Sequence, residues 1–526
     1  MNQRLESVTS AGAEPSILAL DQGTTSSRAI RFDPAGRILA VEQQEFPQIV
    51  RTESRDGREI AIVEHDPEEI WRSQLDCARR VLRSGQGPAG IAAIGITNQR
   101  ETTILWDRRT GRPVAPAIVW QSRVSAPVCE RLRSGGVEPE VRRRTGLVLD
   151  PYFSATKIVH LLERMPGLRA RCEAGEILFG TVDTFLIWRL TGGRVHATDV
   201  TNASRTLLFD IHAAAWSDEL CRVFDVPRAI LPDVRPSAGD FGVTDPAVLG
   251  ERIPIAGCAG DQQAAAFGQG CVLAGSAKTT YGTGAFLMFS TGSEAVESRH
   301  GLLTTLACTG ADTGAGKAAD KAAIPGGFML EGSVFVAGSL VGWLRDGLGL
   351  VAQAAEIEPL ARTVPDTGGV VLVPALTGLG APHWDVAARG LLIGLSRATT
   401  RGHIARAALE AIALSVADVV GCMQQDAGRP LERLRVDGGA SGNDLLMQFQ
   451  ADVLGIPVER PVVRETTSLG AALLAGLAAG IVPDQAAMTA ARRVERVFEP
   501  MMEPATRSRL ISRWHDAVGR CRGWAN

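Results

Sequence analysis

The sequence has no CxxC cysteine pair, no long apolar run and no long run of basic residues, and each absence excludes a class of protein. Its nine cysteines are scattered and odd in number, which argues against a disulfide framework and a zinc site. The longest apolar segment, residues 469–482, is too short to cross a bilayer, and its alanine and glycine content is typical of a tightly packed buried helix. We therefore expect a cytoplasmic protein without membrane insertion.

The charges and the first residues narrow the class further. The formal net charge is -3, and 21% of residues are charged, with no lysine or arginine run that would bind nucleic acid. Residues 1–15 are polar and lack the apolar core of a secretory signal, so we predict a disordered N-terminal extension. A small-molecule partner is favoured, and no nucleic acid is expected.

The pattern along the chain indicates an α/β protein of two domains, because 526 residues exceed what one core usually accommodates. In the first half we predict a hairpin over 17–32, a helix over 67–82 and a strand over 91–97, followed by a mixed unit over 178–190.

Residues 225–256 are rich in proline, glycine and aspartate, so we place the boundary between domains of residues 16–255 and 256–526. In the second half we predict a strand pair over 279–290 and a helix over 403–425, with a flexible surface insertion over 311–327.

Two aspartates beside small polar residues are the most informative local feature. Asp21 follows an apolar strand and precedes a Gly-Thr-Thr-Ser-Ser turn, whose amides and hydroxyls suit phosphate oxygens while the carboxylate suits magnesium. Asp261 stands in a similar setting, Ala-Gly-Asp-Gln-Gln, at the start of the second half. Two α/β halves that each begin with such a turn suggest a phosphoryl-transfer cleft between them, although an ordinary polar hairpin explains the first turn alone.

Two glycine-rich segments are not the phosphate loops that they resemble. The GxGxxG match at 85–90 follows a helix and precedes a strand, which is the reverse of the dinucleotide-binding order. The segment 270–280 differs from a Walker loop because Ser276 and Ala277 displace Lys278. Any nucleotide must therefore be held by the aspartate turns.

Other polar groups stand where strands are expected to end. Arg100 and Glu101 offer a guanidinium beside a carboxylate, which can donate to one hydroxyl and accept from its neighbour, although a surface ion pair is the alternative. Trp120 and Phe286 suit apolar walls, unless they are core residues. Gly438 and Gly439 would let backbone approach a nucleotide closely.

Together these segments resemble the glycerol kinase branch of the FGGY carbohydrate kinases, in order and at family spacing from about residue 16 to 520. The motifs are Leu-Asp-Gln-Gly-Thr-Thr-Ser-Ser (20–27), Gly-Ile-Thr-Asn-Gln-Arg-Glu-Thr-Thr (95–103), Asp-Pro-Tyr-Phe-Ser (150–154), Gly-Thr-Val-Asp-Thr (180–184), Thr-Asn-Ala-Ser-Arg-Thr (201–206), Ala-Gly-Asp-Gln-Gln-Ala-Ala (259–265), Tyr-Gly-Thr-Gly (281–284) and Arg-Val-Asp-Gly-Gly-Ala (435–440).

The resemblance implies a two-domain actin-like ATPase fold, of the ribonuclease H-like and hexokinase type, with an interdomain cleft. It implies magnesium-dependent transfer of the ATP γ-phosphate to the terminal hydroxyl of glycerol, giving sn-glycerol 3-phosphate and ADP in the first step of glycerol catabolism. The N-terminal domain would serve glycerol and phosphate, the C-terminal domain the nucleotide, and the chain would form a homodimer or homotetramer.

Site residues follow from the same resemblance, position by position. Asp261 is expected to be the catalytic base, and Asp21 and Asp261 to organise magnesium. The glycerol pocket would comprise Arg100, Glu101, Trp120, Tyr152, Asp261, Gln262 and Phe286. Phosphate and nucleotide contacts would come from Thr24, Thr25, Ser26, Arg28, Thr283, Gly338, Gly342, Gly439 and Asn443.

Some positions depart from the family pattern. His160 replaces a usual Trp and His383 a usual Tyr, and we interpret both as packing variants; Gly342 replaces a Gln that often faces the nucleotide base. The segment around Gly250 and Arg252 partly resembles a loop that binds fructose 1,6-bisphosphate in some members.

Two alternatives remain open. One is a kinase for another polyol or sugar, such as xylulose, on the same fold, and the other is an actin- or chaperone-like ATPase. The second leaves Arg100, Trp120 and Tyr152 without a purpose.

Overall fold

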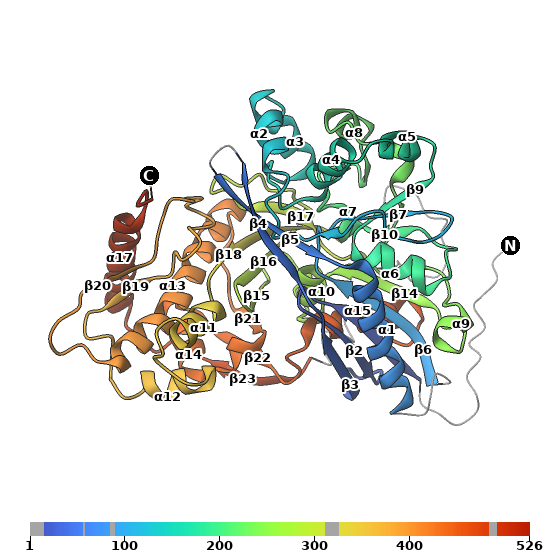
Figure 1. Ribbon diagram of the computed structural model, residues 1–526. Helices are drawn as coiled ribbons and strands as arrows, with labels where there is room; N and C mark the ends of the chain where they lie inside the picture. Colours follow the sequence, from blue (N-terminus) through green and yellow to red (C-terminus); the bar gives the residue numbers. More distant parts are fainter. Residues whose placement is uncertain (1–14, 56–57, 85–89, 311–325, 483–491, 526) are drawn as a thin grey trace. The chain divides into compact units, whose positions relative to one another are not determined.

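The chain has two main β-sheets, a five-stranded sheet in unit 1 and a seven-stranded sheet most of which lies in unit 2 (Figure 1). The computed structural model describes residues 15–55, 58–84, 90–310, 326–482 and 492–525. Unit 1 is assembled from Met1–Gly270, Thr305–Phe328 and Thr466–Ala491, and unit 2 from Cys271–Thr304, Met329–Glu465 and Arg492–Asn526.

The main sheet of unit 1 has five strands in the order β14-β6-β1-β2-β3. The first two strands form the predicted hairpin, β1 (Ser16–Gln22) and β2 (Ser26–Phe32), and β3 (Ile38–Glu45) continues it antiparallel. On the other side β1 is parallel to β6 (Ile91–Asn98), which is parallel to β14 (Ile255–Gly260). Because β1, β6 and β14 are parallel, their carboxyl ends lie at one edge of the sheet.

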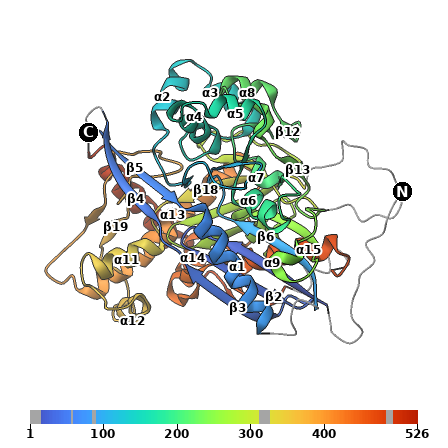
Figure 2. The ribbon, with the colours of Figure 1, turned by 45° about the vertical axis from the view of Figure 1, so that its right-hand side comes forward.

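Two helices cover opposite faces of this sheet, as the alternation of strand side chains shows. Leu18 and Leu20 of β1 belong to the core under α1 (Pro67–Arg83), which Figure 2 shows lying along β2 and β3. Gly95 of β6 instead faces α15 (Thr466–Ala478), where an added Cβ would lie 2.0 Å from the Ala471 carbonyl oxygen. The absence of a side chain lets the backbones of strand and helix touch.

The remaining elements of unit 1 surround this sheet. A short antiparallel sheet joins β4 (Ile49–Arg55), β5 (Arg58–His65) and β8 (Ala117–Ile118). Further strand pairs are β7 (Ile104–Asp107) with β9 (Ile177–Gly180), β10 (Ala197–Asp199) with β13 (Asp233–Arg235), and β11 (Phe209–Asp210) with β12 (Ala215–Trp216).

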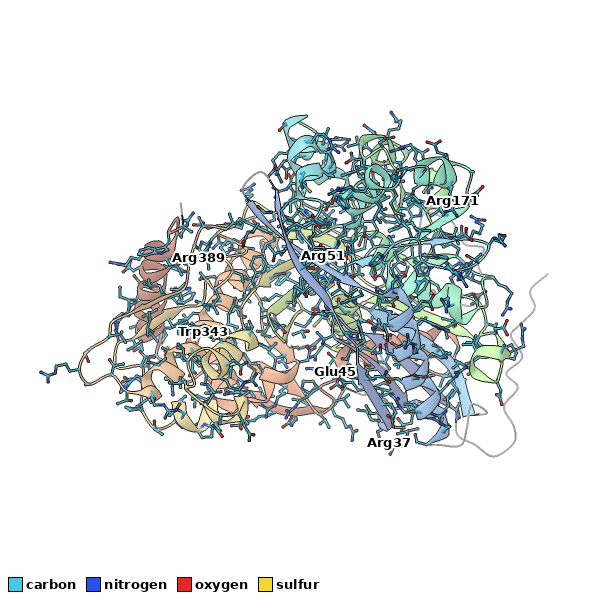
Figure 3. The ribbon with its side chains drawn as sticks, viewed as in Figure 1. Arg37, Glu45, Arg51, Arg171, Trp343 and Arg389 are labelled. Atoms are coloured by element: carbon cyan, nitrogen blue, oxygen red, sulfur yellow. The ribbon has the colours of Figure 1, made fainter. Side chains whose placement is uncertain are left out.

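The helices of this part are α2 (Ala126–Ser134), α3 (Glu138–Thr145), α4 (Ser154–Arg164), α5 (Leu168–Glu173), α6 (Val182–Leu190), α7 (Val200–Ala203), α8 (Asp218–Val223), α9 (Pro246–Leu249) and α10 (Asp261–Gly268), with a 3-10 turn η2 (Arg228–Ile230). Arg171 of α5, labelled in Figure 3, pairs with Asp107 of β7 at 2.6 Å and ties this layer together.

Unit 2 is built on a sheet of order β17-β18-β16-β15-β21-β22-β23. Its strands are β15 (Ala277–Tyr281), β16 (Ala285–Gly292), β17 (Leu303–Leu306), β18 (Phe328–Val334), β21 (Leu434–Asp437), β22 (Val458–Pro461) and β23 (Val494–Phe498), and a separate pair is β19 (Val371–Val373) with β20 (Leu391–Ile393). The helices are α11 (Gly338–Asp346), α12 (Ile357–Ala361), α13 (Arg401–Ala427), α14 (Asp444–Leu454) and α17 (Pro504–Cys521), with 3-10 turns η3 (Ala354–Glu356) and η4 (Gly439–Gly442).

The long helix α13 is the centre of this unit's core. Its buried face, which includes Ala408, Ile412 and Val419, packs in one cluster with the sheet residues Leu287 and Val436. Gly428 ends the helix at φ +59, a left-handed conformation that glycine adopts without strain. Local periodicity therefore predicted this helix nearly to its ends.

The observed units differ from the predicted boundary after residue 255. β14 hydrogen-bonds to β6, and α10 packs against α15, so residues 256–270 belong to unit 1. Residues 466–491 also return to unit 1. The proline- and glycine-rich segment 225–256 thus lies inside unit 1, where it carries short elements such as β13 and α9. Its local composition did not reveal the long-range strand pairing.

Three predictions fall mostly or wholly outside the described residues. They are the N-terminal extension over 1–15, of which only Pro15 is described, the glycine-rich loop over 85–90, of which only Gly90 is described, and the insertion over 311–327, of which only 326 and 327 are described. Within the described part of the chain, no helix has the length and apolar character needed to cross a membrane.

Candidate active site

Asp21 lies at the carboxyl end of β1, where the predicted turn reverses the chain. Gly23 N donates to Ser26 O at 2.9 Å and closes that turn. The Ser468 hydroxyl of α15 donates to Asp21 Oδ2 at 2.7 Å. The carboxylate is therefore fixed by the strand and by a helix from the far end of the sequence.

The turn after Asp21 presents the predicted phosphate-binding side chains in different settings. Thr25 is exposed, whereas the Thr24 hydroxyl accepts a hydrogen bond from Trp120 Nε1 at 3.0 Å. Ser26 Oγ accepts from Gln43 Nε2 at 3.1 Å, and Gln43 also accepts from Arg28 Nε at 3.2 Å. Trp120 thus links the predicted polyol pocket to the predicted phosphate turn.

Arg100, Glu101 and Asp261 form a charge cluster in unit 1. Arg100 Nε lies 3.1 Å from Asp261 Oδ1 and 3.8 Å from Glu101 Oε1. Arg100 and Glu101 are almost fully buried, while the Asp261 side chain is 33% exposed. The surface ion pair considered as an alternative is excluded, because both Arg100 and Glu101 are buried, and only Asp261 of the three is partly open to solvent.

The backbone around Asp261 fixes the direction of its side chain. It is the first residue of α10, and Gln262 N donates to its Oδ1 at 2.7 Å. The preceding Gly260 is needed because an added Cβ would lie 2.7 Å from Arg100 Cγ and Cδ. Gly260 N donates to Thr201 Oγ1 at 2.9 Å, which anchors the end of β14 to α7. Asp261 Oδ1 is thereby held between a backbone amide and a guanidinium.

The donor set at Asp21 fits a divalent cation. Burial raises the pKa of Asp21, opposed by the charge of Arg28 and the Ser468 hydrogen bond, and the negative charge of Asp261 raises it further. Two carboxylates that repel one another and offer hard oxygen atoms suit magnesium, which would relieve the repulsion. Asp21 and Asp261 thus offer oxygen donors of the kind that magnesium prefers, and their assignment to the metal stays a prediction.

Aromatic side chains form one wall beside this charge cluster. Trp120 and Tyr152 meet edge to face, with ring centroids 5.6 Å apart. The Arg205 guanidinium lies over the Tyr152 ring at 5.6 Å and donates through Nε to Glu101 Oε1 at 2.6 Å. The structure thus brings Trp120 and Tyr152 together and connects Tyr152 to Glu101 through Arg205.

In unit 2 three of the predicted nucleotide residues follow two parallel strands: Thr283 follows β15, and Gly439 and Asn443 follow β21. The Thr283 carbonyl accepts from Ser339 N at 3.0 Å, and an added Cβ on Gly338 would lie 2.5 Å from Gly282 O. The turn after β15 is therefore packed on the first residues of α11.

The second strand end carries the glycine pair. Gly438 has φ +82, and its Cα packs on the Tyr281 backbone, so a side chain there is excluded. Gly439 has no heavy atom within 4 Å of an added Cβ, and Asn443 caps α14 by accepting from Leu446 N at 2.9 Å. The open backbone at Gly439 is suited to close approach of a ligand.

The last two predicted positions of unit 2 lie on different elements. Gly342 is on α11 and faces open space. Phe286 is on β16 opposite Thr280, and the Gln262 predicted beside it belongs to α10 of unit 1. Their assignment to ligands remains a prediction.

Sequence reasoning missed two buried cations that support the pocket. Lys157 of α4 and Arg205 after α7 are both fully buried, and both contact Glu101. Arg205 belongs to the 201–206 motif, but it was given no role, and Lys157 lies on the buried face of α4, a helix that the sequence analysis did not predict. A charged residue on a buried helix face is the signal that would have found Lys157.

A second acidic cluster in unit 1, formed by Asp183, Asp199 and Cys258, has oxygen and sulfur atoms within 4.8 Å of one another. Burial raises the pKa of Asp183 to about 6. Asp183 accepts from the hydroxyl of Thr198 at 2.6 Å and Asp199 from that of Ser237 at 2.7 Å. Because donors already serve both carboxylates, we assign this cluster to packing.

Comparison with known proteins agrees with this geometry. Residues 16–268 match the N-terminal domain, and residues 277–479 the C-terminal domain, of the FGGY family of carbohydrate kinases. The chain belongs to this family. An FGGY relative, a glycerol kinase of Paracidovorax citrulli, is 55% identical over 95% of this chain and 98% of its own length.

Among solved FGGY-type structures, the glycerol kinase of Plasmodium falciparum with ADP has a TM-score of 0.87 at 36% identity, covering 97% of this chain and 99% of its own. A xylulose kinase of Lactobacillus acidophilus has a TM-score of 0.81 at 20% identity, covering 96% and 98%. The second likeness shows only the fold, so the fold by itself does not separate a polyol from a sugar substrate.

Two of the departures from the FGGY pattern are partly buried histidines, His160 and His383. His160 is half-buried on α4. His383 Nε2 lies 3.9 Å from Asp418 Oδ2, and Asp418 also accepts from Trp514 Nε1 at 2.7 Å. His383 therefore belongs to a polar cluster that joins α13 to α17 within unit 2.

Proposed function

We propose that this FGGY kinase phosphorylates glycerol with ATP, giving sn-glycerol 3-phosphate and ADP. The observation that carries the proposal is the buried Arg100 with Glu101 and Asp261 around it, beside the Trp120 and Tyr152 rings. A short triol offers adjacent hydroxyls to such a set and narrow C–H faces to the aromatic wall. The 55% identity to a glycerol kinase supports the same substrate.

In the proposed reaction Asp261 is the general base. Its carboxylate accepts the proton of the terminal hydroxyl while that oxygen attacks the γ-phosphorus and the bond to the β–γ bridging oxygen breaks, releasing ADP. Arg100 Nε, 3.1 Å from Asp261 Oδ1, keeps the carboxylate oriented. Glu101 accepts from a second hydroxyl, which fixes which oxygen reacts.

Asp21 and Asp261 would hold magnesium, which supplies positive charge to the phosphate oxygens when bound. The hydroxyls and amides of Thr24, Thr25 and Ser26, with Arg28, would contact phosphate oxygens from unit 1. In unit 2, Thr283, Gly338, Gly439 and Asn443 would contact the nucleotide, where close backbone approach at Gly439 favours binding. The remaining predicted positions keep the roles that the family resemblance implies. Gly342 would contact the nucleotide, and Gln262 and Phe286 would line the glycerol pocket.

Substrate choice tests the proposal against its rival, a kinase for another polyol or sugar. ADP formation is measured with glycerol, dihydroxyacetone, erythritol and xylulose at equal ATP and magnesium. We expect kcat/KM to be highest for glycerol, because longer chains cannot satisfy the same hydrogen bonds beside the aromatic wall. A preference for xylulose or erythritol would replace glycerol with that substrate.

Regulation, assembly and location are proposed on the resemblance alone. Gly250, at φ +86, ends α9, and Arg252 is exposed two residues later, so both are open to a fructose 1,6-bisphosphate effector. We expect a cytoplasmic homodimer or homotetramer. Activity and light-scattering mass are measured with and without the sugar bisphosphate, and no change in either would exclude the effector.

A further inference from the structure

Lys157 is a fully buried lysine that the reaction does not use. It lies on α4, and its Nζ donates to two backbone carbonyls, Tyr152 O at 2.5 Å and Glu101 O at 3.0 Å. Burying a lysine is costly unless its ammonium group is hydrogen-bonded. Both of its partners belong to residues of the proposed glycerol pocket.

Glu101 has a backbone conformation that needs this support. Its φ is +61, in the left-handed region that residues with a side chain rarely adopt. The Glu101 carbonyl accepts from Lys157 Nζ, from Ser154 Oγ at 3.1 Å and from Thr103 Oγ1 at 3.2 Å. Such strained residues persist only where their surroundings fix them, and they concentrate at functional sites.

A second cation holds the same two residues by their side chains. Arg205 donates to Glu101 Oε1 and lies over the Tyr152 ring. Lys157 fixes the two backbones and Arg205 fixes the carboxylate and the ring. The pocket wall formed by Glu101 and Tyr152 is therefore clamped from two elements, α4 and the segment after α7.

We propose that Lys157 is a positioning residue that sets selectivity for a triol, by holding Glu101 in its left-handed conformation and Tyr152 beside it. This inference rests on the proposed glycerol phosphorylation. Lys157 itself does not touch substrate; it acts through the direction in which the Glu101 carboxylate points. With Glu101 held, a substrate that lacks one hydroxyl makes one hydrogen bond fewer to the Glu101 carboxylate and is bound less well.

The protonation of Lys157 agrees with this role. Burial lowers the pKa of Lys157 to about 7, with Glu101 and Asp150 opposing the shift. The neutral amine still has two N–H groups, enough for its two carbonyl partners. A methionine of similar length has none.

The test compares Lys157→Met with Ile158→Ala, a cavity-forming change at the next, fully buried position of α4. Each variant is assayed with glycerol and with propane-1,2-diol, which lacks one terminal hydroxyl, and KM is measured for both glycerol and ATP. For Lys157→Met we expect the ratio of kcat/KM for glycerol over the diol to fall about 10- to 100-fold, since misplacement of a positioning group has effects of this size. The KM for ATP should stay within about threefold, because a loss confined to the polyol wall leaves nucleotide binding intact.

Ile158→Ala separates positioning from general damage to α4. It should lower the melting temperature and leave the glycerol-to-diol ratio as in the unmodified enzyme. Lys157→Gln, whose amide keeps two N–H groups, should recover most of the ratio. If Lys157→Met does not fold, Lys157→Leu, which also lacks N–H groups, takes its place in the test. An unchanged ratio in a folded Lys157→Met or an equal loss in Ile158→Ala would overturn the proposal.

The assays distinguish a failure of the proposed function from a failure of the positioning role of Lys157. If the unmodified enzyme prefers another polyol, the glycerol assignment is lost whatever the variants do. If it prefers glycerol and the Lys157→Met ratio is unchanged, only the positioning role is lost.

Discussion

Replacing Asp261 with asparagine tests the proposed base most directly. Both contacts that orient its carboxylate, from Gln262 N at 2.7 Å and from Arg100 Nε at 3.1 Å, use Oδ1. Asparagine keeps an oxygen that can accept at that position, so the side chain should stay in place. What is lost is the ability to take a proton.

The expected loss of kcat follows because the substitution removes the proton acceptor and keeps the oriented oxygen. Loss of general-base catalysis lowers kcat by about 10²- to 10⁴-fold, which is about 3 to 5 kcal/mol of activation free energy at about 1.36 kcal/mol per factor of ten. Glycerol affinity should change by less than about tenfold, because the neutral oxygen still accepts from Arg100 and the other pocket groups remain. Asp261→Asn should therefore bind glycerol and hardly phosphorylate it.

The assay measures ADP formation at saturating glycerol and ATP, with glycerol binding followed by calorimetry. Asp225→Asn is the matched control: its side chain is 78% exposed, and its φ of +51 is one that asparagine tolerates well. We expect the control to retain full activity. A kcat for Asp261→Asn within tenfold of the unmodified enzyme would remove Asp261 from the role of base.

Three further changes have outcomes set by packing and charge. An added Cβ at Gly342 meets no atom within 4 Å, so Gly342→Gln should be tolerated and raise the free energy of unfolding by up to about 1 kcal/mol. Because this position often carries a glutamine that faces the nucleotide base in the family, the variant should also lower the KM for ATP; an increased KM would show that the position does not face nucleotide. Gly95→Ala would place a Cβ 2.0 Å from Ala471 O and should destabilise the protein by at least about 1 to 3 kcal/mol. The control Gly421→Ala, in open space on α13, should not destabilise it. Equal urea midpoints for the two variants would contradict the close packing of strand and helix. Burial lowers the pKa of Lys157 to about 7, from about 10.4 in the unfolded chain. Between these pH values the unfolded state binds more protons than the folded state, so the free energy of unfolding should rise with pH. Lys157→Met should lack this rise in urea titrations at pH 7 to 9.5.

Much of the fold could be predicted because its signals are local. The hairpin around Asp21 and helix α1 are read from alternation, helical periodicity and turn residues within short windows. Asp66, at the start of α1, accepts from Glu68 N at 2.9 Å and acts as the helix cap. Such features depend on neighbours in the sequence, so the structure reproduced them closely.

The unit boundary could not be predicted in the same way. Whether β14 belongs to the first or the second unit depends on its pairing with β6, far earlier in the chain. Glycines 95 and 257 indicated nothing in isolation, because their purpose appears only when α15 packs on them. Long-range pairing has no local composition signal.

The site shows the same division. Arg100 and Glu101 were found because a charged pair at a strand end is a local pattern. Lys157 was not assigned a role, because that role depends on the left-handed backbone of Glu101 and on where the Tyr152 carbonyl points. The sequence does not show where a backbone carbonyl group will point, so a lysine that donates to such a group looks like an isolated charge.

The return of α15 to unit 1 sets the order in which this protein can complete its folding. During synthesis β1, β6 and β14 leave the ribosome long before residues 466–478 of α15. The sheet face at Gly95 and Gly257 therefore lacks the helix that packs on it until most of unit 2 has been synthesised. Ser468, which holds Asp21, arrives with the same helix. A nascent chain stalled before α15 would thus lack both the last layer of its first core and the support of its proposed metal ligand, and neither unit can be produced from one uninterrupted stretch of the gene.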